Sequence, residues 1–271
     1  MAKGDAARWR VEPGGKVHLA KIDTRSTDGA PGDKAETEPV LEDLSRRLTE
    51  LQERLYAEGE RSLLVVLQAI DAGGKDGTIK HVFRGLNPAG SRVASFKVPS
   101  DEERSHDFLW RIHAKAPARG EVVVFNRSHY EDVLVVRVHD LVPEDVWRPR
   151  FDFINDFEAN LVASGTRIVK LYLHISKEEQ AERFQARLDD PSKRWKFRTG
   201  DLTERARWDD YVAAFEEAIG ATSTASAPWY VVPADRKWYR NWAVSRILVE
   251  ALEDMDPQYP PAEDLSGVVV T

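Results

Sequence analysis

Residues 63–81 read LLVVLQAIDAGGKDGTIKH, and the prediction of the fold starts from this stretch. Residues 63–67 form an apolar run with two valines, which is typical of a strand buried on both faces of a parallel sheet. Gly73 and Gly74 interrupt the run, Lys75 follows at once, and a helical pattern begins at about Thr78. A glycine turn and a helix N-terminus present backbone N–H groups, and a lysine adds a full positive charge. The stretch therefore predicts a phosphate-binding loop.

The loop departs from the general phosphate-loop pattern GxxxxGK[ST], which requires Gly at position 69 and Ser or Thr at position 76. This chain has Ala69 and Asp76, and Thr78 is the nearest hydroxyl. The alternative interpretation is a plain strand–turn–helix corner with a surface lysine. We favour phosphate binding because the flanking strand and helix supply the context that the motif requires. The residues expected to contact phosphate are Ala72, Gly73, Gly74, Lys75, Asp76, Gly77, Thr78 and Lys80.

Composition narrows the class of protein. At 271 residues the chain is long enough for one large α/β domain with a full core. The absence of cysteine excludes disulfides, thiolate nucleophiles and Cys-bound zinc, and it fits a cytoplasmic location. No signal-peptide or membrane-span pattern occurs, so we expect no membrane partner. Because the net charge is −7, we expect no nucleic-acid partner, and any polyanionic ligand must be held by a local basic cluster.

Hydrophobic periodicity and turn residues predict strands that alternate with helices. Predicted strands span residues 63–67, 92–98, 121–125, 168–175 and 229–232. Predicted helices span residues 40–59, 78–86, 100–115, 143–165, 176–190, 202–219 and 237–252, with a further one ending near residue 139. This alternation predicts an α/β fold with a parallel sheet of about five strands and helices on both faces. Ligands of such sheets bind beyond the carboxyl ends of the strands.

The predicted organisation has three parts. Residues 1–38 are poor in apolar groups and are expected to form an extended arm or a partly ordered tail. Residues 39–255 are expected to form the α/β domain that carries the predicted phosphate-binding loop, and residues 256–271 a C-terminal tail. Trp238 and Trp242 belong either to the core or to an interface between subunits.

Side chains suited to phosphoryl transfer follow two of the predicted strands, and this reaction needs positioning and charge neutralisation more than covalent chemistry. Asp71 lies four residues before Lys75, where its carboxylate either binds Mg²⁺ or orients the incoming oxygen, or else caps the turn. Asn126, Arg127 and Ser128 follow the third strand, and Arg127 can bind a phosphate bidentately. Glu131 is either a carboxylate near the metal or the partner of Arg127 in a salt bridge at the helix start.

Residues 183–198 carry a local excess of positive charge. Its basic residues, opposed only by two aspartates, are Arg183, Arg187, Lys193, Arg194, Lys196 and Arg198. Arg183 and Arg187 are four residues apart, so both project from one helix face. A solvated basic face is the usual meaning of such a run. Its position after the fourth strand, where P-loop kinases carry a basic lid, favours a lid over residues 183–200 that closes on phosphates.

Taken together, these segments resemble the polyphosphate kinase 2 family. The matching stretches are AIDAGGKDGTIKHV (69–82), NP (87–88), SFKVPSDEE (95–103), FNRSHYEDVLVVRVH (125–139), RFQARLDDPSKRWKF (183–197), Trp208 with Tyr211, APWYVVPAD (227–235) and Lys237. Only Ala69 departs from the family's loop, GxDxxGKxGT. The matching loop residues are Asp71, Lys75, Gly77 and Thr78.

The resemblance implies a three-layer P-loop kinase-like fold, similar to thymidylate kinase, with a helical lid. It implies transfer of a phosphoryl group between inorganic polyphosphate and AMP, ADP or other adenine or guanine nucleotides, with Mg²⁺ or Mn²⁺, in a homo-oligomer (dimer or tetramer). Asp71 and Lys75 correspond to essential loop residues and Arg127 to the second motif. The expected polyphosphate contacts in the lid are Arg183, Arg187, Lys193 and Lys196, and the expected nucleotide contacts are Asn126, Arg127 and Ser128.

The second motif departs from the form DRSWYN found in many members of that family. Residues 126–131 read NRSHYE, which resembles the subgroup that phosphorylates both nucleoside mono- and diphosphates. The exchange removes one metal carboxylate at Asn126 and supplies another at Glu131. The expected catalytic residues are therefore Asp71, Lys75, Arg127 and Glu131, with Asp71 and Glu131 as the metal ligands.

Two other functions stay open at this point. The first is an ATP-dependent nucleoside-monophosphate kinase, which a comparison of polyphosphate with ATP as donor would distinguish. The second is a non-catalytic phosphate-binding regulator, which Ala69, Asp76 and Asn126 would favour. Retention of Asp71, Lys75 and the basic lid argues against the regulator, because a protein that only binds phosphate needs no mobile lid.

Overall fold

The structure, a computed structural model, describes residues 4–264. At its centre lies a parallel sheet with the strand order β2-β3-β1-β4-β5. The strands are β1 (Ser62–Gln68), β2 (Ser91–Ser95), β3 (Val122–Asn126), β4 (Thr166–His174) and β5 (Trp229–Pro233). Every residue of β1 is buried, as its apolar run predicts, because β1 is the middle strand and helices cover both of its faces. The predicted five-stranded parallel α/β fold is confirmed.

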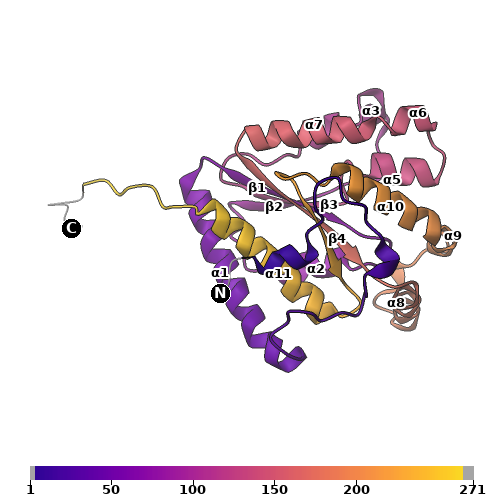
Figure 1. Ribbon diagram of the computed structural model, residues 1–271, viewed down its shortest axis with the longest axis horizontal. Helices are drawn as coiled ribbons and strands as arrows, with labels where there is room; N and C mark the ends of the chain where they lie inside the picture. Colours follow the sequence, from indigo (N-terminus) through magenta and orange to yellow (C-terminus); the bar gives the residue numbers. More distant parts are fainter. Residues whose placement is uncertain (1–3, 265–271) are drawn as a thin grey trace.

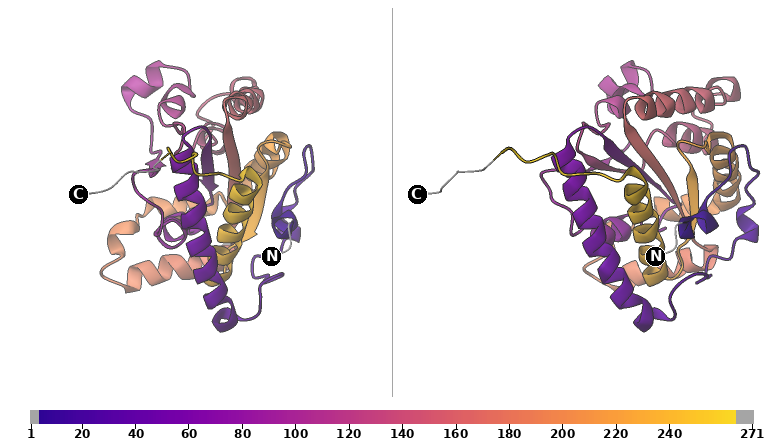
Figure 2. Two further views of the ribbon diagram at one scale, coloured as in Figure 1. Left: turned by 90° about the vertical axis from the view of Figure 1, so that its left-hand side faces the viewer. Right: turned by 60° about the vertical axis from the view of Figure 1, so that its left-hand side comes forward.

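Helices form a layer on each face of the sheet (Figure 1). One layer holds α1 (Lys34–Glu58), α2 (Lys75–Val82) and α11 (Lys237–Met255), and α1 and α11 lie side by side (Figure 2). The other layer holds α5 (Glu131–Val138), α7 (Arg150–Ala163) and α10 (Trp208–Thr222). The remaining helices are η1 (Asp5–Trp9), η2 (Leu19–Lys21), α3 (Asp101–Ser105), α4 (Trp110–His113), α6 (Glu144–Trp147), α8 (Lys177–Asp189), η3 (Arg194–Lys196) and α9 (Gly200–Ala206).

Two helices begin earlier than their sequence patterns predict. Helix α1 begins at Lys34 instead of Val40, because Asp33 and Glu36 form a capping box ahead of the apolar pattern. Helix α2 begins at Lys75 instead of Thr78, directly after Gly74, whose φ of 105° ends the loop. Lys75 and Asp76 therefore lie in the first turn of α2.

Strand β2 ends at Ser95, three residues before the predicted end at Val98. Three of the predicted helices are each divided into two shorter helices in the structure. The helix predicted over residues 100–115 is α3 and α4, although the capping box of Ser100 and Glu103 is present. The helix predicted over 143–165 divides into α6 and α7 at Pro149, which has no N–H to donate. The helix predicted over 202–219 divides into α9 and α10 at Arg207.

Residues 4–33 form an extended arm that packs along the β5 edge (Figure 2). Trp9 and Leu19 are buried, and the Trp9 ring meets Trp242 edge-to-face with centroids 5.5 Å apart. Of the predicted arm, residues 4–33 pack on the domain, residues 34–38 belong to α1, and residues 1–3 lie outside the described residues. Trp242 belongs to the core, whereas Trp238 is half-buried against it.

Residues 256–264 of the predicted C-terminal tail leave α11 as an extended chain (Figure 1), and residues 265–271 of that prediction lie outside the described residues. Within residues 4–264, no helix combines the length and the apolar character that a membrane crossing requires.

Candidate active site

The candidate site lies where the chain leaves β1 and β3 at their carboxyl ends. These two central strands pair in register, with Leu67 opposite Asn126, and β4 flanks β1 on its other side. Helices that follow β1 and β4 therefore leave on either side of this point, which is where ligands bind in open α/β sheets. The predicted loop after β1 and the predicted motif after β3 meet here.

The loop between β1 and α2 depends on two glycines. A Cβ atom at Gly73 would lie 2.4 Å from the Ala69 Cβ and 2.8 Å from the Ile70 carbonyl oxygen. Gly73 thus leaves room for the Ala69 methyl, which explains how the loop tolerates alanine where the general pattern has glycine. Gly74 has φ of 105°, and Ala72 also lies in the left-handed region at 60°. A non-glycine residue held there carries backbone strain, which is common at ligand-binding sites.

Lys75 extends back over this loop. Its Nζ donates a hydrogen bond to the Ala69 carbonyl oxygen at 2.8 Å, and the residue is half-buried. Burial lowers the pKa of Lys75, and the nearby Arg127 charge lowers it further. The Thr78 hydroxyl is buried and donates to the Gly74 carbonyl oxygen at 3.2 Å. The ammonium group is thus poised at the loop, whereas the Thr78 hydroxyl stabilises its own helix.

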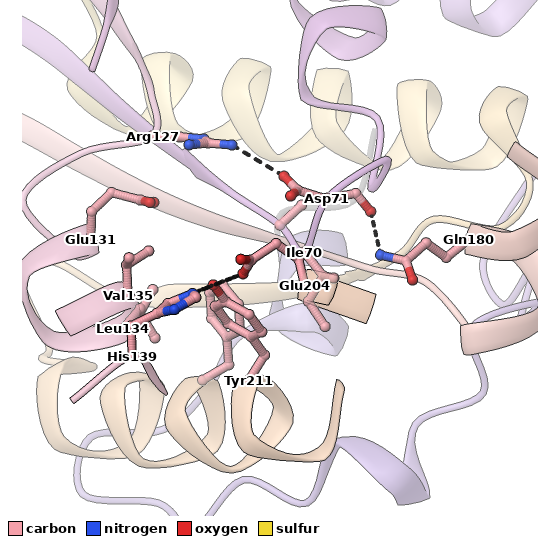
Figure 3. A pocket seen from close by; sticks show the side chains of 12 residues that line it. Ile70, Asp71, Arg127, Glu131, Leu134, Val135, His139, Gln180, Glu204 and Tyr211 are labelled. Carbon is pink, nitrogen blue, oxygen red and sulfur yellow. Dashed lines mark hydrogen bonds and ion pairs between the residues drawn. The ribbon is translucent and has the colours of Figure 1, made fainter. Parts of the chain in front are cut away.

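Asp71 and Arg127 form an ion pair across the two strand ends, with Arg127 Nη2 3.1 Å from Asp71 Oδ1 (Figure 3). Arg127 also has a left-handed backbone, with φ of 62°. Burial opposes the charge of Arg127, but Glu131 and Asp71 outweigh it, so the pKa of Arg127 is raised. The helix-start salt bridge to Glu131, which the sequence left open, is replaced by the pair with Asp71.

The ion pair opens into a pocket of about 200 Å³. Figure 3 shows the Arg127–Asp71 pair above the pocket, the α5 side chains Glu131 and Leu134 on its left, and Tyr211 of α10 below. Its lining residues are Ala69, Ile70, Asp71, Arg127, Glu131, Leu134, Val135, His139, Gln180, Glu204, Tyr211 and Phe215. An apolar wall with a few convergent polar groups is the usual form of a small-molecule site.

Four polar residues of this pocket were not among the predicted site residues. His139 Nε2 lies 2.9 Å from Glu204 Oε2, and the Tyr211 hydroxyl donates to the same oxygen at 2.7 Å. These three come from the ends of α5, α9 and α10, so no local spacing relates them. Gln180 Nε2 donates to the Asp71 carbonyl oxygen at 2.8 Å. Its position three residues before Arg183 on one helix face is a signal that could have identified it.

The second motif divides between the site and the core. Asn126 Nδ2 donates to Asp76 Oδ1 at 3.0 Å, which joins the motif to the first turn of α2. Ser128 is fully buried, and its hydroxyl accepts hydrogen bonds from Gln68 Nε2 at 3.1 Å and from the Tyr130 backbone N–H at 3.2 Å. The Ser128 side chain therefore lies beneath the site, away from the pocket where the sequence placed it as a nucleotide contact.

The predicted lid residues separate into one buried arginine and a group of exposed cations. Arg183 is 9% exposed, and its guanidinium donates to the carbonyl oxygens of Ala72 at 2.9 Å and Ala234 at 2.6 Å, and to Glu179 at 2.7 Å. It ties the phosphate loop to α8 and to the end of β5. The lid prediction for Arg183 therefore changes from a mobile contact to a fixed anchor.

The other predicted lid residues are exposed or partly exposed to solvent. Lys193 is exposed and pairs with Asp190 at 2.5 Å, and the partly exposed Arg187 stacks on Phe184. Lys196 Nζ reaches to 3.9 Å from Asp76, which brings η3 toward the phosphate loop. Lys80 is exposed on α2.

Metal binding rests on few carboxylates. Among residues 4–264, no group of three or more His, Asp or Glu side chains could hold an ion. Asp71 and Glu131 both line the pocket. Mg²⁺ is usually bound through one or two carboxylates, with water and substrate phosphates completing the shell, so this sparse donor set fits it.

Comparison with known proteins identifies the family to which this chain belongs. The polyphosphate kinase 2 (PPK2) family matches residues 32–260, which include the loop, the second motif and the lid. The chain belongs to the polyphosphate kinase 2 family. This result confirms the family and the predicted function of polyphosphate-dependent nucleotide phosphotransfer.

Named relatives of this polyphosphate kinase match it over nearly its whole length. The AMP/ADP-polyphosphate phosphotransferase of Meiothermus ruber is 56% identical, covering 97% of this chain and 98% of its own. The ADP-polyphosphate phosphotransferase of Rhodopseudomonas palustris is 45% identical, with coverages of 93% and 91%. The crystal structure of polyphosphate kinase 2 from Arthrobacter aurescens TC1 has a TM-score of 0.93 at 48% identity, with coverages of 97% and 94%. The predicted P-loop kinase-like fold is thereby confirmed.

Proposed function

We propose that this polyphosphate kinase transfers a phosphoryl group between inorganic polyphosphate and AMP or ADP, with Mg²⁺ held by Asp71 and Glu131. The observation that carries the proposal is the Asp71–Arg127 ion pair, which stands between the phosphate loop and the 200 Å³ pocket. Polyphosphate at the loop and a nucleotide in the pocket would therefore meet at this pair. The names of the Meiothermus and Rhodopseudomonas relatives support AMP and ADP as acceptors.

In the direction of nucleotide phosphorylation, an oxygen of the acceptor's terminal phosphate attacks the terminal phosphorus of the chain, and the bond to the next phosphate breaks. The acceptor oxygen is already largely ionised near pH 7, because the second pKa of a phosphate group is about 6, so no strong base is needed. Charge repulsion between two polyanions is the main obstacle. Lys75 and Arg127 oppose it with full positive charges, and the loop adds backbone N–H groups.

A bound magnesium ion would supply further charge neutralisation on the phosphates. Asp71 also accepts a hydrogen bond from Gln180 through its backbone oxygen, so its carboxylate is held at the edge of the pocket. We expect Arg127 to exchange part of its contact with Asp71 for a substrate phosphate, because a guanidinium binds phosphate bidentately. Asp71 would then be released toward the metal.

The pocket wall suits the acceptor nucleoside. Ile70, Leu134 and Phe215 supply apolar surface for a base, and the His139–Glu204–Tyr211 group supplies hydrogen-bonding atoms at its edge. This surface is compatible with both adenine and guanine, since both are neutral rings that bind without a charged side chain. A cytoplasmic location and a homo-oligomeric state stay predictions.

The direct test is nucleotide formation with polyphosphate and Mg²⁺ as the only additions. We expect ADP and ATP from AMP, and ATP from ADP, measured by ion-exchange chromatography. Parallel reactions with ATP as the donor to AMP distinguish an ATP-dependent monophosphate kinase. Turnover with ATP alone as donor, or no turnover with either donor, would contradict the proposal.

The metal ligands are tested by titration. In Asp71→Asn and Glu131→Gln proteins, the Mg²⁺ concentration for half-maximal rate should rise several-fold, because each variant removes one of the two carboxylates at the pocket. Glu144→Gln, an exposed change on α6, is the matched control and should titrate like the parent. Unchanged Mg²⁺ requirement in both pocket variants would place the metal elsewhere.

A further inference from the structure

Arg240 is a buried cation for which the described part of the chain provides no acidic partner. It lies in the first turn of α11 and is only 2% exposed. Its Nε and Nη2 donate to the Asn241 side-chain oxygen at 3.1 and 2.7 Å. Among residues 4–264 no carboxylate lies within ion-pair distance of its guanidinium. A neutral amide is therefore its side-chain acceptor.

The guanidinium of Arg240 lies directly against the phosphate loop. A Cβ atom at Gly74 would come within 2.2 Å of Arg240 Nη1, and one at Gly77 within 3.4 Å of Arg240 Nη2. Arg183 approaches the same glycine, with its Nη1 3.3 Å from that Gly74 Cβ position. Gly74 thus has a second role, because a side chain at position 74 would displace this cation, whereas Gly77 lies at ordinary contact distance from it.

Burial and the neighbouring Arg183 charge make the charge of Arg240 less favourable in the free protein. Together they lower the pKa of Arg240 to about 10, so Arg240 stays protonated at neutral pH. The N-terminus of α11 places its positive dipole end beside the group. His81, on α2, has its own pKa lowered by burial and by Arg240. Arg183 differs, because it pairs with Glu179.

A buried, unpaired charge is costly, and proteins retain one where a ligand supplies the opposite charge. We infer that Arg240 holds an unneutralised positive charge against the phosphate loop for the polyphosphate chain, which supplies the missing counter-charge. Arg240 is a positioning residue in this inference, since it acts on the loop and its bound anion from the α11 side. The inference rests on the proposed function, because it takes polyphosphate as the anion at the loop.

The donor and not the acceptor is the expected partner. Arg240 does not line the pocket proposed for the nucleotide, and it contacts Gly74 and Gly77 instead. A chain of phosphates at the loop carries several negative charges, whereas AMP in the pocket places its single phosphate near Arg127. Loss of Arg240 should therefore weaken the binding of polyphosphate far more than the binding of AMP.

The experiment measures thermal stability and binding in Arg240→Gln, with linear tripolyphosphate and AMP as probes. Without ligand, the melting temperature should equal or exceed that of the parent, because a costly buried charge is gone. With tripolyphosphate, the stabilisation should shrink, and calorimetry should show Kd higher by about tenfold or more, as loss of one buried charge contact predicts. The Kd for AMP should stay within about twofold of the parent value, far below that tenfold step.

Two variants serve as controls. Arg119→Gln removes the same charge from an exposed site at the amino end of β3, and it should change neither Kd. Arg240→Lys keeps the charge and should recover much of the tripolyphosphate affinity. If Arg240→Gln does not fold, Arg240→Met, which keeps most of the apolar contacts, replaces it.

The possible outcomes separate the two proposals. A lower melting temperature without ligand, together with unchanged tripolyphosphate affinity, would show that Arg240 is structural and overturn the inference alone. Failure of both Arg240→Gln and Arg240→Met to fold would also overturn it. Absence of tripolyphosphate binding by the parent protein would overturn the proposed function together with the inference.

Discussion

Two groups of buried charges lie in this protein, and they differ in how they are neutralised. In the core group, Lys170 Nζ lies 2.5 Å from Glu158 Oε2 and donates to the Tyr130 hydroxyl at 3.1 Å, and the His129 Nε2 lies 3.3 Å from Glu158. In the loop group, Lys75 and Arg240 have only neutral oxygens as acceptors.

This difference separates the charges that stabilise the fold from the charges that are expected to bind the substrate. The core group belongs to α7, β4 and the second motif, and its members neutralise one another without a ligand. Because His129 and Tyr130 lie two and three residues after Arg127, this group positions the motif from below. The loop group lacks counter-charges that a polyanion would provide. We therefore expect changes in the core group to affect stability and changes in the loop group to affect turnover.

The largest effect is expected from Glu158→Ala. It leaves the Lys170 ammonium buried without its partner, and breaking such a pair costs about 3–5 kcal/mol of unfolding free energy. Chemical denaturation of the parent and variant measures the loss. The double variant Glu158→Ala with Lys170→Met should recover part of it, and Arg148→Ala in the exposed pair with Glu144 should cost less than about 1 kcal/mol. A Glu158→Ala protein as stable as the parent would remove the distinction between the two groups.

The second effect is on catalysis. Lys75→Ala should lower kcat by about 10²–10³-fold, which is about 2.7–4 kcal/mol, the loss typical of one removed electrostatic donor. The unfolding free energy should change little, because Lys75 has no charged partner to leave unpaired. Lys115→Ala, an exposed lysine at the opposite end of the sheet, should behave like the parent. Near-normal turnover by a folded Lys75→Ala protein would show that the loop lysine does not contact the phosphates.

The third effect is a dependence of stability on pH. Burial lowers the pKa of His129, against the opposing contact with Glu158. As the pH drops, His129 therefore takes up a proton in the unfolded chain at a higher pH than in the folded protein. The unfolding free energy should fall below about pH 6.5, by at most about 1.4 kcal/mol per pH unit. The His129→Phe protein should show a shallower loss between pH 6.5 and 5 in denaturation curves. Identical pH profiles would mean that another group carries the acid sensitivity.

The smallest effect concerns Arg187 in the lid. Arg187→Gln should weaken polyphosphate binding by about 0.2–1 kcal/mol at low salt, as expected for a charge near the surface. The difference from the parent should vanish near 1 M salt, where the Debye length is about 3 Å. The apparent affinity for polyphosphate measured over a range of salt concentrations provides the check. If the variant's affinity for polyphosphate depends on salt as the parent's does, Arg187 does not contact polyphosphate.

Local patterns in the chain determined much of this protein. The apolar run of β1, the glycines of the loop and the capping box at Ser100 act within a few residues, so the sequence predicts them without knowledge of the rest. Lys75, Asp71 and Arg127 were predicted for the same reason, since they follow strand ends that a parallel sheet must bring together.

Which charged side chains have partners depends on tertiary packing and cannot be predicted from local patterns. The positive run after β4 predicts a lid, but the burial of Arg183 depends on carbonyl oxygens from the loop and the end of β5. Arg240 has no local signal, because its position at the loop follows from the packing of α11 beside α2. Sequence spacing reports neighbours within a helix or strand, whereas the cost of a charge depends on burial and on the groups that distant segments place around it.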